Sequence, residues 1–337
     1  MQTLVRTIAA SVLGMALATQ VLAQDKPVVI RAGYLGPPPA QMMSVFTLKP
    51  ELLKHHGKTY TVEPRQMRGV TIMVTAFAAG ELDFGWAGFT SLHHAIANAG
   101  LTDVRVIGDE AEDGFHGKFS SEFRVRKDSG IDKISDLKGK IVGISSRGGA
   151  GDVLVRYTLR KHGVEASDYT YLETGFATMK AMLLQKKIDA GYFIPPFAFD
   201  PEVAEQTKVL FTIDTEFGPI MQNFMVSRGA FIAKNRAAMV DFLEDFLRVA
   251  RWYYDPKNRD EAIKIVSEIS KVPAEALRGF IFTDRDNYRN MDGLPDLNVI
   301  QSNWAVMKEL GLSRRDLNIN DYADLSLMKE AAARLNR

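Results

Sequence analysis

Backbone amides at three glycine-rich points are the groups in this chain best placed for chemistry. Gly69 and Gly175 each open a predicted helical stretch, and a third glycine-rich segment spans residues 145–152. The first turn of a helix leaves its N–H groups unpaired and carries partial positive charge, so it attracts anions. The three points therefore predict a binding site for a small, anionic molecule.

The segments that follow Gly69 and Gly175 are two copies of one pattern. Residues 69–86 and 175–192 align at a single offset, at which glycine meets glycine, methionine meets methionine, aspartate meets aspartate, and Trp86 meets Tyr192. The pattern predicts an α/β lobe that was built twice. Ligands of open α/β sheets lie at the carboxyl ends of the strands, so two facing lobes would hold a molecule between them.

The third segment, residues 145–152, follows a predicted strand at 141–144 and precedes a predicted helix that ends near His162. It lacks both the Lys-Ser/Thr ending of a P-loop and the spacing of a dinucleotide-binding fingerprint. Nucleotide binding is therefore not indicated. Two interpretations stay open: the bare amides receive an anion, or the segment is an ordinary glycine-rich turn.

Side-chain catalysis has little support in the sequence. The histidines at 55–56 and 93–94 are adjacent pairs on predicted helices, where neighbouring side chains point in different directions and cannot share a metal by i,i+4 spacing. Ser145 and Ser146 have no His/Asp partner at a recognisable spacing. We expect no enzymatic activity, no cofactor and no metal.

The N-terminus is typical of a secretory signal peptide. Arg6 is followed by an apolar stretch at 8–18, and the small residues at 21–23 predict cleavage after Ala23. An uncleaved membrane anchor is the alternative. The chain has no cysteine, which excludes a lipid-modified cysteine and disulfides. We expect a soluble periplasmic protein with residues 1–23 removed.

Composition excludes two further classes. Lys+Arg number 42 and Asp+Glu 41, so the basic excess that nucleic-acid binding requires is missing. No basic amphipathic stretch indicates binding to a membrane surface. Strand and helix signals alternate along the chain, which favours a mostly parallel sheet. Expected strands are 28–35, 60–64 and 104–108; expected helices are 44–56, 235–255, 260–269, 297–310 and 322–335.

Several of these fragments, in this order and spacing, resemble the solute-binding proteins of ABC importers for nitrate, sulfonates and taurine, the NMT1-like group. The fragments are Ala-Ala-Gly-Glu-Leu-Asp at 78–83, Ser-Asp-Leu-Lys-Gly-Lys at 135–140, Ile-Asp-Ala at 188–190 with Pro195-Pro196, and Ala-Phe-Ile-Ala-Lys-Asn at 230–235. The resemblance covers nearly all of the chain after residue 23.

The resemblance implies a type II periplasmic binding protein, an α/β fold with two Rossmann-like lobes joined by two hinge strands. Lobe 1 would comprise residues 24–120 and 226–337, and lobe 2 residues 121–225. Hinges are expected near 119–125 and 221–226. A protein of this kind acts as a monomer and delivers its solute to an ABC permease in the inner membrane.

The resemblance also implies ligand contacts at loop positions of both lobes. Carried onto this chain, they are Tyr34, Leu35, Gly36, Arg68, Gly69, Trp86, Ala87, Gly88, Ser146, Arg147, Gly148, Gly175, Phe176 and Pro195. Arg68 and Arg147 are the leading candidates, because a guanidinium matches the oxygens of carboxylate, sulfonate or phosphate. Alternatively, both are solvated or pair with Glu63 or Asp152. Trp86 either forms an apolar wall for the ligand or belongs to the core.

Aromatic residues are numerous in or near the expected cleft loops: Trp86, Phe89, Phe115, Phe176, Phe193 and Phe197. Such a set favours an organic solute over nitrate, since rings supply apolar area and orient flat groups. The expected ligand is a sulfonate, an aromatic carboxylate or a related heterocycle. Two alternatives remain: an enzyme of the branch that makes the thiamine pyrimidine precursor, whose cysteine-rich motif this chain lacks, and a periplasmic ligand sensor.

Overall fold

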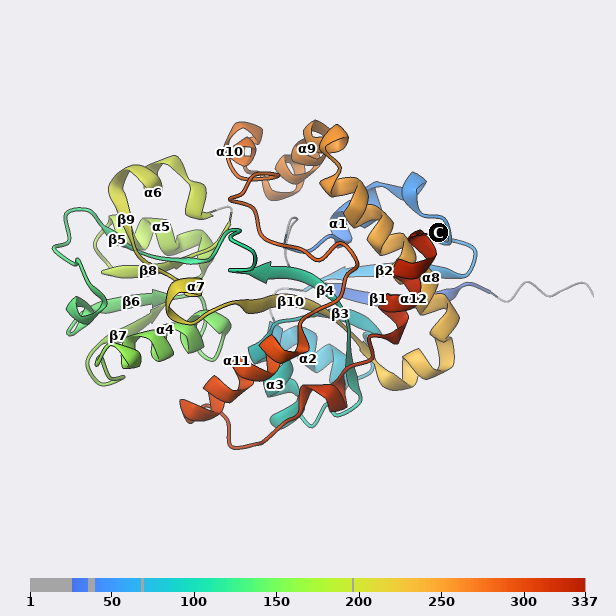
Figure 1. The fold of residues 1–337 in the computed structure, drawn as a ribbon, viewed down its shortest axis with the longest axis horizontal. Coiled ribbons are helices and arrows are strands. Elements are labelled where there is room, and N and C mark those ends of the chain that lie inside the picture. The colour runs from blue at the N-terminus through green and yellow to red at the C-terminus, as the bar shows by residue number, and fades with distance from the viewer. Residues whose placement is uncertain (1–25, 36–39, 68–69, 196, 337) are drawn as a thin grey trace, which may run out of the picture.

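The computed structural model describes residues 26–35, 40–67, 70–195 and 197–336. They form two α/β lobes that lie side by side, each around its own five-stranded sheet (Figure 1). The expected signal peptide, residues 1–23, lies outside the described residues, as do three expected ligand contacts, Gly36, Arg68 and Gly69.

Lobe 1 contains a mixed sheet in the order β2-β1-β3-β10-β4. β1 pairs in parallel with β2 and β3, whereas β10 runs antiparallel to both β3 and β4. The prediction of a mostly parallel sheet therefore applies to β1, β2 and β3 but not to β4 and β10. The bounds are β1 Val28–Tyr34, β2 Tyr60–Gln66, β3 Phe84–Ala87, β4 Val104–Asp113 and β10 Ile220–Arg228.

Lobe 2 repeats this plan in the order β7-β6-β8-β5-β9. β6 pairs in parallel with β7 and β8, and β5 runs antiparallel to β8 and β9. In each sheet a strand that arrives from the other lobe is thus inserted antiparallel beside three parallel strands. The bounds are β5 Glu122–Arg126, β6 Ile141–Ile144, β7 Thr170–Glu173, β8 Ala190–Phe193 and β9 Thr207–Thr212.

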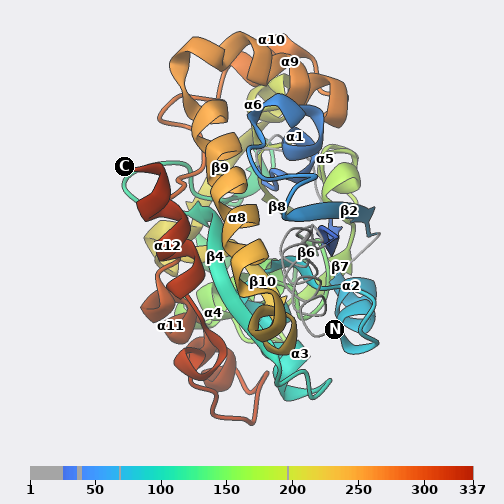
Figure 2. The same cartoon turned by 90° about the vertical axis from the view of Figure 1, so that its right-hand side faces the viewer.

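Helices cover both faces of the lobe 1 sheet (Figure 2). α1, α8 and α12 pack on one face, and α2, α3 and α11 lie against the other. The bounds are α1 Met43–Leu48, α2 Val70–Ala78, α3 Phe89–Ala97, α8 Gly229–Tyr254, α9 Arg259–Ser270, α10 Ala274–Arg278, α11 Leu297–Glu309 and α12 Ser326–Leu335.

The four helices predicted beyond residue 235 are confirmed, because each carries an apolar face at three- and four-residue spacing. α8 begins earlier than predicted, at Gly229, and α12 begins later, at Ser326. The helix predicted over 44–56 is wrong in length. α1 ends at Leu48, since Pro50 disfavours helical backbone at Lys49, whose φ and ψ are −120° and 56°. Lobe 2 has α4 Ala150–Lys161, α5 Phe176–Leu184, α6 Pro201–Gln206 and α7 Ile213–Glu216.

The duplication predicted from the sequence is visible in matching contacts of the two aspartates. Asp83 accepts a hydrogen bond from the Arg31 N–H at 3.1 Å, and Asp189 accepts one from the Ile141 N–H at 2.9 Å. In each lobe the aspartate thereby ties the segment before one strand, β3 or β8, to the neighbouring strand, β1 or β6. The same residue type performs the same structural task twice.

Glycines show the same correspondence. A Cβ added at Gly33 in β1 would lie 2.7 Å from Cδ1 of Leu82, and one added at Gly143 in β6 would lie 2.5 Å from Cδ1 of Ile188. Both distances are shorter than a real Cβ contact, so any larger residue would force the Leu82 or Ile188 side chain to shift where the helix–strand connection crosses the neighbouring strand. The two lobes are built on one packing scheme.

The chain crosses between the lobes twice. The first crossing lies between the end of β4 at Asp113 and the start of β5 at Glu122, and the second follows β9 and α7 and enters β10 at Ile220. The segment 221–226, which we expected to act as a hinge, lies inside a strand of the lobe 1 sheet. Within the described residues, no helix is long and apolar enough to cross a bilayer.

Candidate functional site

The expected ligand contacts that the structure describes lie at the ends of strands that point toward the opposite lobe. In lobe 1, Tyr34 ends β1 and Ala87 ends β3. In lobe 2, the segment 145–149 follows β6, and Pro195 comes two residues after β8. These are carboxyl ends of parallel strands, which is the edge where open α/β sheets bind ligands.

One of these loops lies close to the opposite lobe. A Cβ built on Gly148 of lobe 2 would lie 3.6 Å from Nε2 of His94, which belongs to α3 of lobe 1. The loop after β6 therefore approaches the helix that begins just after Gly88. The structure thus brings the expected loop after β6 of lobe 2 close to α3 of lobe 1.

On the lobe 1 side, the loop after β1 is held by its own polar groups. The Leu35 N–H donates to Oε1 of Gln41 at 2.7 Å, and the Met67 N–H donates to the Tyr34 carbonyl at 2.7 Å. Gly88 precedes α3, and its N–H donates to Oγ of Ser91 at 2.9 Å. Tyr34, Leu35, Ala87 and Gly88 are all half-buried.

Trp86 does not line this edge. Its side chain is 1% exposed and packs against Phe84 and Phe246 at centroid distances of 4.8 and 6.1 Å. The ring therefore lies on the sheet face that α8 covers. Trp86 belongs to the core and does not form an apolar wall for a ligand. Phe89 and Phe193 are buried as well, which leaves half of the expected aromatic set, Phe115, Phe176 and Phe197, half-buried.

The amides of the loop after β6 are already occupied by carboxylates of the same lobe. The Arg147 N–H donates to Oε1 of Glu173 at 2.8 Å, and the Gly148 N–H donates to Oδ2 of Asp152 at 2.8 Å. Asp152 is buried and also pairs with Arg156 at 2.6 Å. Two amides of the loop are thus paired with carboxylates of α4 and β7 in the same lobe, and this pairing leaves both sequence interpretations of the loop open.

The Arg147 side chain lies on the surface of lobe 2. The side chain is 61% exposed, and its guanidinium lies 3.8 Å from the Glu173 carboxylate and 5.7 Å from the ring centre of Tyr171. The partner is therefore Glu173 and not Asp152, which we considered from the sequence. Ser146, beside it, is exposed.

Gly175 and Phe176 form the start of α5. Gly175 has φ +65° and ψ 158°, a backbone conformation that residues with a Cβ rarely adopt. Phe176 follows and stacks on Phe197 with ring centres 6.4 Å apart and planes at 10°. This half-buried pair is the aromatic surface that lobe 2 presents near the expected site.

A buried acidic run on β4 was not recognised in the sequence. Asp109, Glu110, Glu112 and Asp113 are all at most 3% exposed. A register shift of β4 against β10 leaves Glu110 as an extra residue, which is a β-bulge. Glu110 pairs with the buried Arg289 at 2.8 Å and accepts from the Met42 N–H at 2.8 Å.

Asp109 and Glu112 share a proton. Burial, strengthened by the charge of Asp109, raises the pKa of Glu112 to about 9, so that Glu112 stays protonated at neutral pH and donates to Asp109. Burial likewise raises the pKa of Asp109 to about 7, against the opposing effect of Arg289. The buried acidic run thus contains a protonated Glu112, the Asp109 carboxylate that it contacts, and the ion pair of Glu110 with Arg289.

Asp113 anchors the first crossing. Its carboxylate accepts from the Ser121 N–H at 3.0 Å and from the Ser121 hydroxyl, so it joins the end of β4 to the residue before β5. Burial raises the pKa of Asp113 to about 6. The acidic run therefore supports the crossing between the lobes rather than the expected ligand contacts.

Comparison with known proteins places this geometry in a family. The model of the NMT1-like family matches residues 23–267, which include both sheets and the loops described above. The chain belongs to the NMT1-like family.

Relatives and solved structures agree with that assignment. A chain of Brucella abortus that is named only as a binding protein is 26% identical over 265 residues, which cover 76% of this chain and 75% of the relative. The periplasmic aliphatic sulphonate binding protein SsuA from Escherichia coli superposes with a TM-score of 0.70 at 19% identity over 88% of this chain and 92% of its own. The fold is that of a type II periplasmic binding protein.

The same fold also occurs in an enzyme. The desulfurization enzyme DSZB superposes with a TM-score of 0.65 at 13% identity over 91% of this chain and 99% of its own. Fold alone therefore does not separate binding from catalysis within this group of structures.

One histidine of the NMT1-like chain does meet carboxylates. His55 lies 3.2 Å from Glu244 and 3.9 Å from Asp241, and the three side chains offer ligand atoms within 4.8 Å of one another. However, Arg334 binds Asp241 at 2.7 Å and Arg248 binds Glu244 at 2.7 Å. The group is an ion-pair network between the segment before β2, α8 and α12.

Proposed function

We propose that this chain is the solute-binding component of an ABC importer. It captures a small organic solute between its lobes in the periplasm, acts as a monomer, and delivers the solute to an inner-membrane permease. The observation that carries this proposal is the close approach of the lobe 2 loop after β6 to α3 of lobe 1, where a Cβ on Gly148 would lie 3.6 Å from Nε2 of His94. Family membership supports it.

The proposed ligand is a small organic anion, either a sulfonate or an aromatic carboxylate, or a related heterocycle. Arg147 supports an anionic group, because its side chain is exposed and only loosely paired with Glu173. The stacked rings of Phe176 and Phe197 support a flat or apolar part. A ligand anion that reached the Arg147 amide would take the place of the Glu173 carboxylate.

A melting-shift screen of small sulfonates, aromatic carboxylates and heterocycles tests the proposal. A ligand that binds only the folded state raises the melting temperature in proportion to the logarithm of its concentration. We expect at least one compound to do so reversibly, and Arg147→Ala or Arg68→Ala to abolish the shift. Arg315→Ala is the matched control, since this exposed arginine lies in lobe 1 beyond α11.

Full binding in both arginine variants would refute the assignment of the arginines, and no shift with any compound class would refute the ligand class. The second candidate function is catalysis, which the superposition with DSZB favours. Incubation of the stabilising compound with purified protein, followed by analysis of the small molecule, separates the two. Unchanged compound supports a receptor, whereas turnover supports an enzyme.

A further inference from the structure

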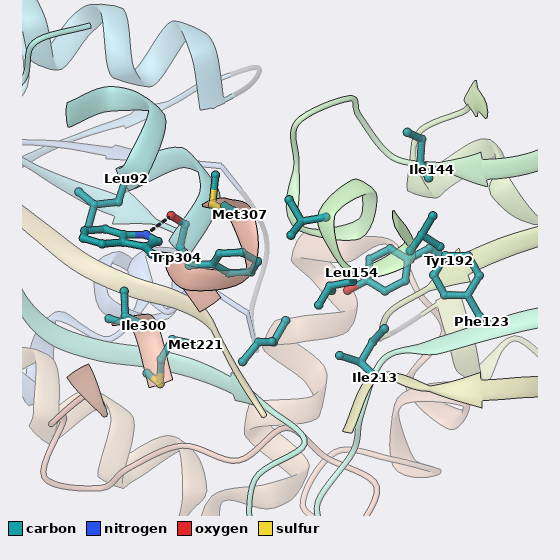
Figure 3. Packing of buried hydrophobic residues seen from close by; sticks show 14 of the residues in the cluster. Leu92, Phe123, Ile144, Leu154, Tyr192, Ile213, Met221, Ile300, Trp304 and Met307 are labelled. Atoms are coloured by element: carbon teal, nitrogen blue, oxygen red, sulfur yellow. Dashed lines mark hydrogen bonds between the residues drawn. The ribbon is translucent and has the colours of Figure 1, made fainter. Parts of the chain in front are cut away.

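The helix α11 is shared between the two lobes. It contacts α3 of lobe 1 and α4 of lobe 2, and it runs beneath the region where the chain crosses between them (Figure 1). Its buried residues belong to one continuous apolar cluster that includes side chains of both lobes. In Figure 3, Ile300, Trp304 and Met307 of α11 lie on one side of this cluster and Leu154 and Tyr192 of lobe 2 on the other.

On the lobe 1 side, α11 is firmly anchored. The Trp304 indole N–H donates to the Phe89 carbonyl at 2.7 Å, and the indole ring meets the buried His93 edge-on at 5.3 Å. Trp304 is 3% exposed. Because a buried indole N–H needs its acceptor, this hydrogen bond fixes the position of α11 on α3.

On the lobe 2 side, α11 makes fewer polar contacts. The Arg160 guanidinium of α4 donates to the Glu309 carbonyl at the end of α11 at 3.3 Å. Tyr157, Arg160, Lys161 and Glu309 surround a hollow of about 250 Å³ between the two helices. The contact with α4 is therefore apolar at its buried side and incompletely packed at its surface.

A second apolar contact between the lobes lies on the opposite side of the crossings. Phe199 of lobe 2 stacks on Phe280 of lobe 1 with ring centres 4.6 Å apart, and the Arg285 guanidinium lies 4.3 Å above the same ring. Any bending at the crossings has to open or slide at least one of these two contacts. Since exposing apolar surface to water is unfavourable, both contacts favour lobes that touch.

We propose that α11 is an interlobe strap, which stays with lobe 1 and holds lobe 2 close to it in the absence of ligand. The strap restricts the ligand-free protein to a narrow range of lobe separations. The apparent affinity for a ligand equals the intrinsic affinity multiplied by the fraction of molecules that already have the binding conformation. A protein whose ligand-free form largely populates that conformation therefore binds more tightly. The inference needs only the two-lobed fold, and it holds whichever ligand the protein binds.

Distances between two spin labels test this strap directly. The chain has no cysteine, so Ala99→Cys at the end of α3 and Ser167→Cys before β7 can be labelled without background, and both positions are exposed. We expect one narrow distance distribution for the ligand-free protein. Met307→Ala, which loosens α11, and Arg160→Ala, which removes its polar contact with α4, should each widen the distribution toward longer distances.

Two variants serve as matched controls. Met328→Ala removes an equally buried methionine from the lobe 1 cluster around α8, and Arg156→Ala removes an arginine of α4 whose contacts stay within lobe 2. Both should leave the distribution unchanged. If Met307→Ala does not fold, Arg160→Ala decides. A broad distribution in the parent protein, or an unchanged one in every folded strap variant, would overturn the proposal, and ligand screening plays no part in this readout.

Discussion

The two lobes share one construction and differ in how their equivalent positions are paired. In lobe 1, Asp83 holds the backbone of β1 and also the Arg31 guanidinium, at 2.7 and 2.6 Å. Among the residues that the structure describes, the carboxylate of the equivalent Asp189 in lobe 2 accepts from the Ile141 N–H alone. The duplicated pattern thus preserves the backbone tie, and lobe 1 has added a charged partner to it.

The two lobes also differ in where their carboxylates lie, and here lobe 2 has the additional contacts at its loop. The lobe 2 loop after β6 is already bound by Glu173 and Asp152, whereas four buried carboxyl groups of lobe 1 lie together on β4. An equivalent architecture therefore does not imply an equivalent capacity for a ligand anion. In lobe 2, the affinity of the loop for a ligand anion depends on the free energy needed to displace the Glu173 carboxylate from the Arg147 N–H.

The largest difference between the lobes is expected from removing the two aspartates. Asp83→Ala leaves the Arg31 guanidinium and a backbone N–H without their acceptor, so it should cost about 2–4 kcal/mol of unfolding free energy. Asp189→Ala loses one backbone hydrogen bond at a half-buried position and should cost about 1 kcal/mol. Urea unfolding of both variants measures the order, and an equal cost would contradict the comparison.

The shared packing scheme predicts the next effect. Gly143→Ala places a Cβ 2.5 Å from Cδ1 of Ile188 and should destabilise by about 1–3 kcal/mol through overpacking. Ile188→Val removes that methyl group, so the double variant should recover part of the loss. A double-mutant cycle by chemical denaturation checks this coupling. Strict additivity of the two changes would show that the close approach does not limit this position.

The acidic run gives lobe 1 a pH dependence. In the folded chain, burial raises the pKa of Asp109 to about 7, and burial together with the charge of Asp109 raises the pKa of Glu112 to about 9, from ordinary values of 3.8 and 4.5. Between these values the folded state holds more protons than the unfolded state, so the unfolding free energy falls as the pH rises from about 4 to about 9. Glu112→Gln keeps a hydrogen-bond donor at this position but has no proton that titrates. The unfolding free energy of this variant should therefore decrease less with pH than that of the parent protein.

Melting temperatures measured from pH 5 to pH 9 check that expectation. Lys308→Ala, an exposed change on α11 far along the chain from β4, should leave the slope of the parent protein intact. An identical slope for Glu112→Gln and the parent would show that this carboxyl does not hold its proton.

Local patterns carried much of the fold. The repeat, the alternation of strands and helices, and the apolar faces of α8, α9 and α11 depend on residues close in sequence, and each was predicted. The two lobes and their family followed from the order of short fragments. The early end of α1 is also a local feature, since Pro50 marks it.

The site depended on contacts between distant residues. Trp86 is buried because α8, about 160 positions later, covers its face of the sheet. The loop amides are filled because Glu173 ends a neighbouring strand. The run at 109–113 has the composition of a solvated segment, and only Arg289 and the surrounding core explain its burial. None of these partners can be identified from spacing in a single sequence.

The smallest expected effect sharpens the comparison of the loops. Glu173→Gln removes a charge from an exposed pair, so the unfolding free energy should change by no more than about 1 kcal/mol. The same change frees the Arg147 guanidinium from its counter-charge and weakens the hold on the loop amide. Affinity for the best sulfonate or carboxylate should therefore rise several-fold, as measured by calorimetry. Glu165→Gln, an exposed acid elsewhere in lobe 2, is the control; if both variants bind alike, Glu173 does not guard this loop.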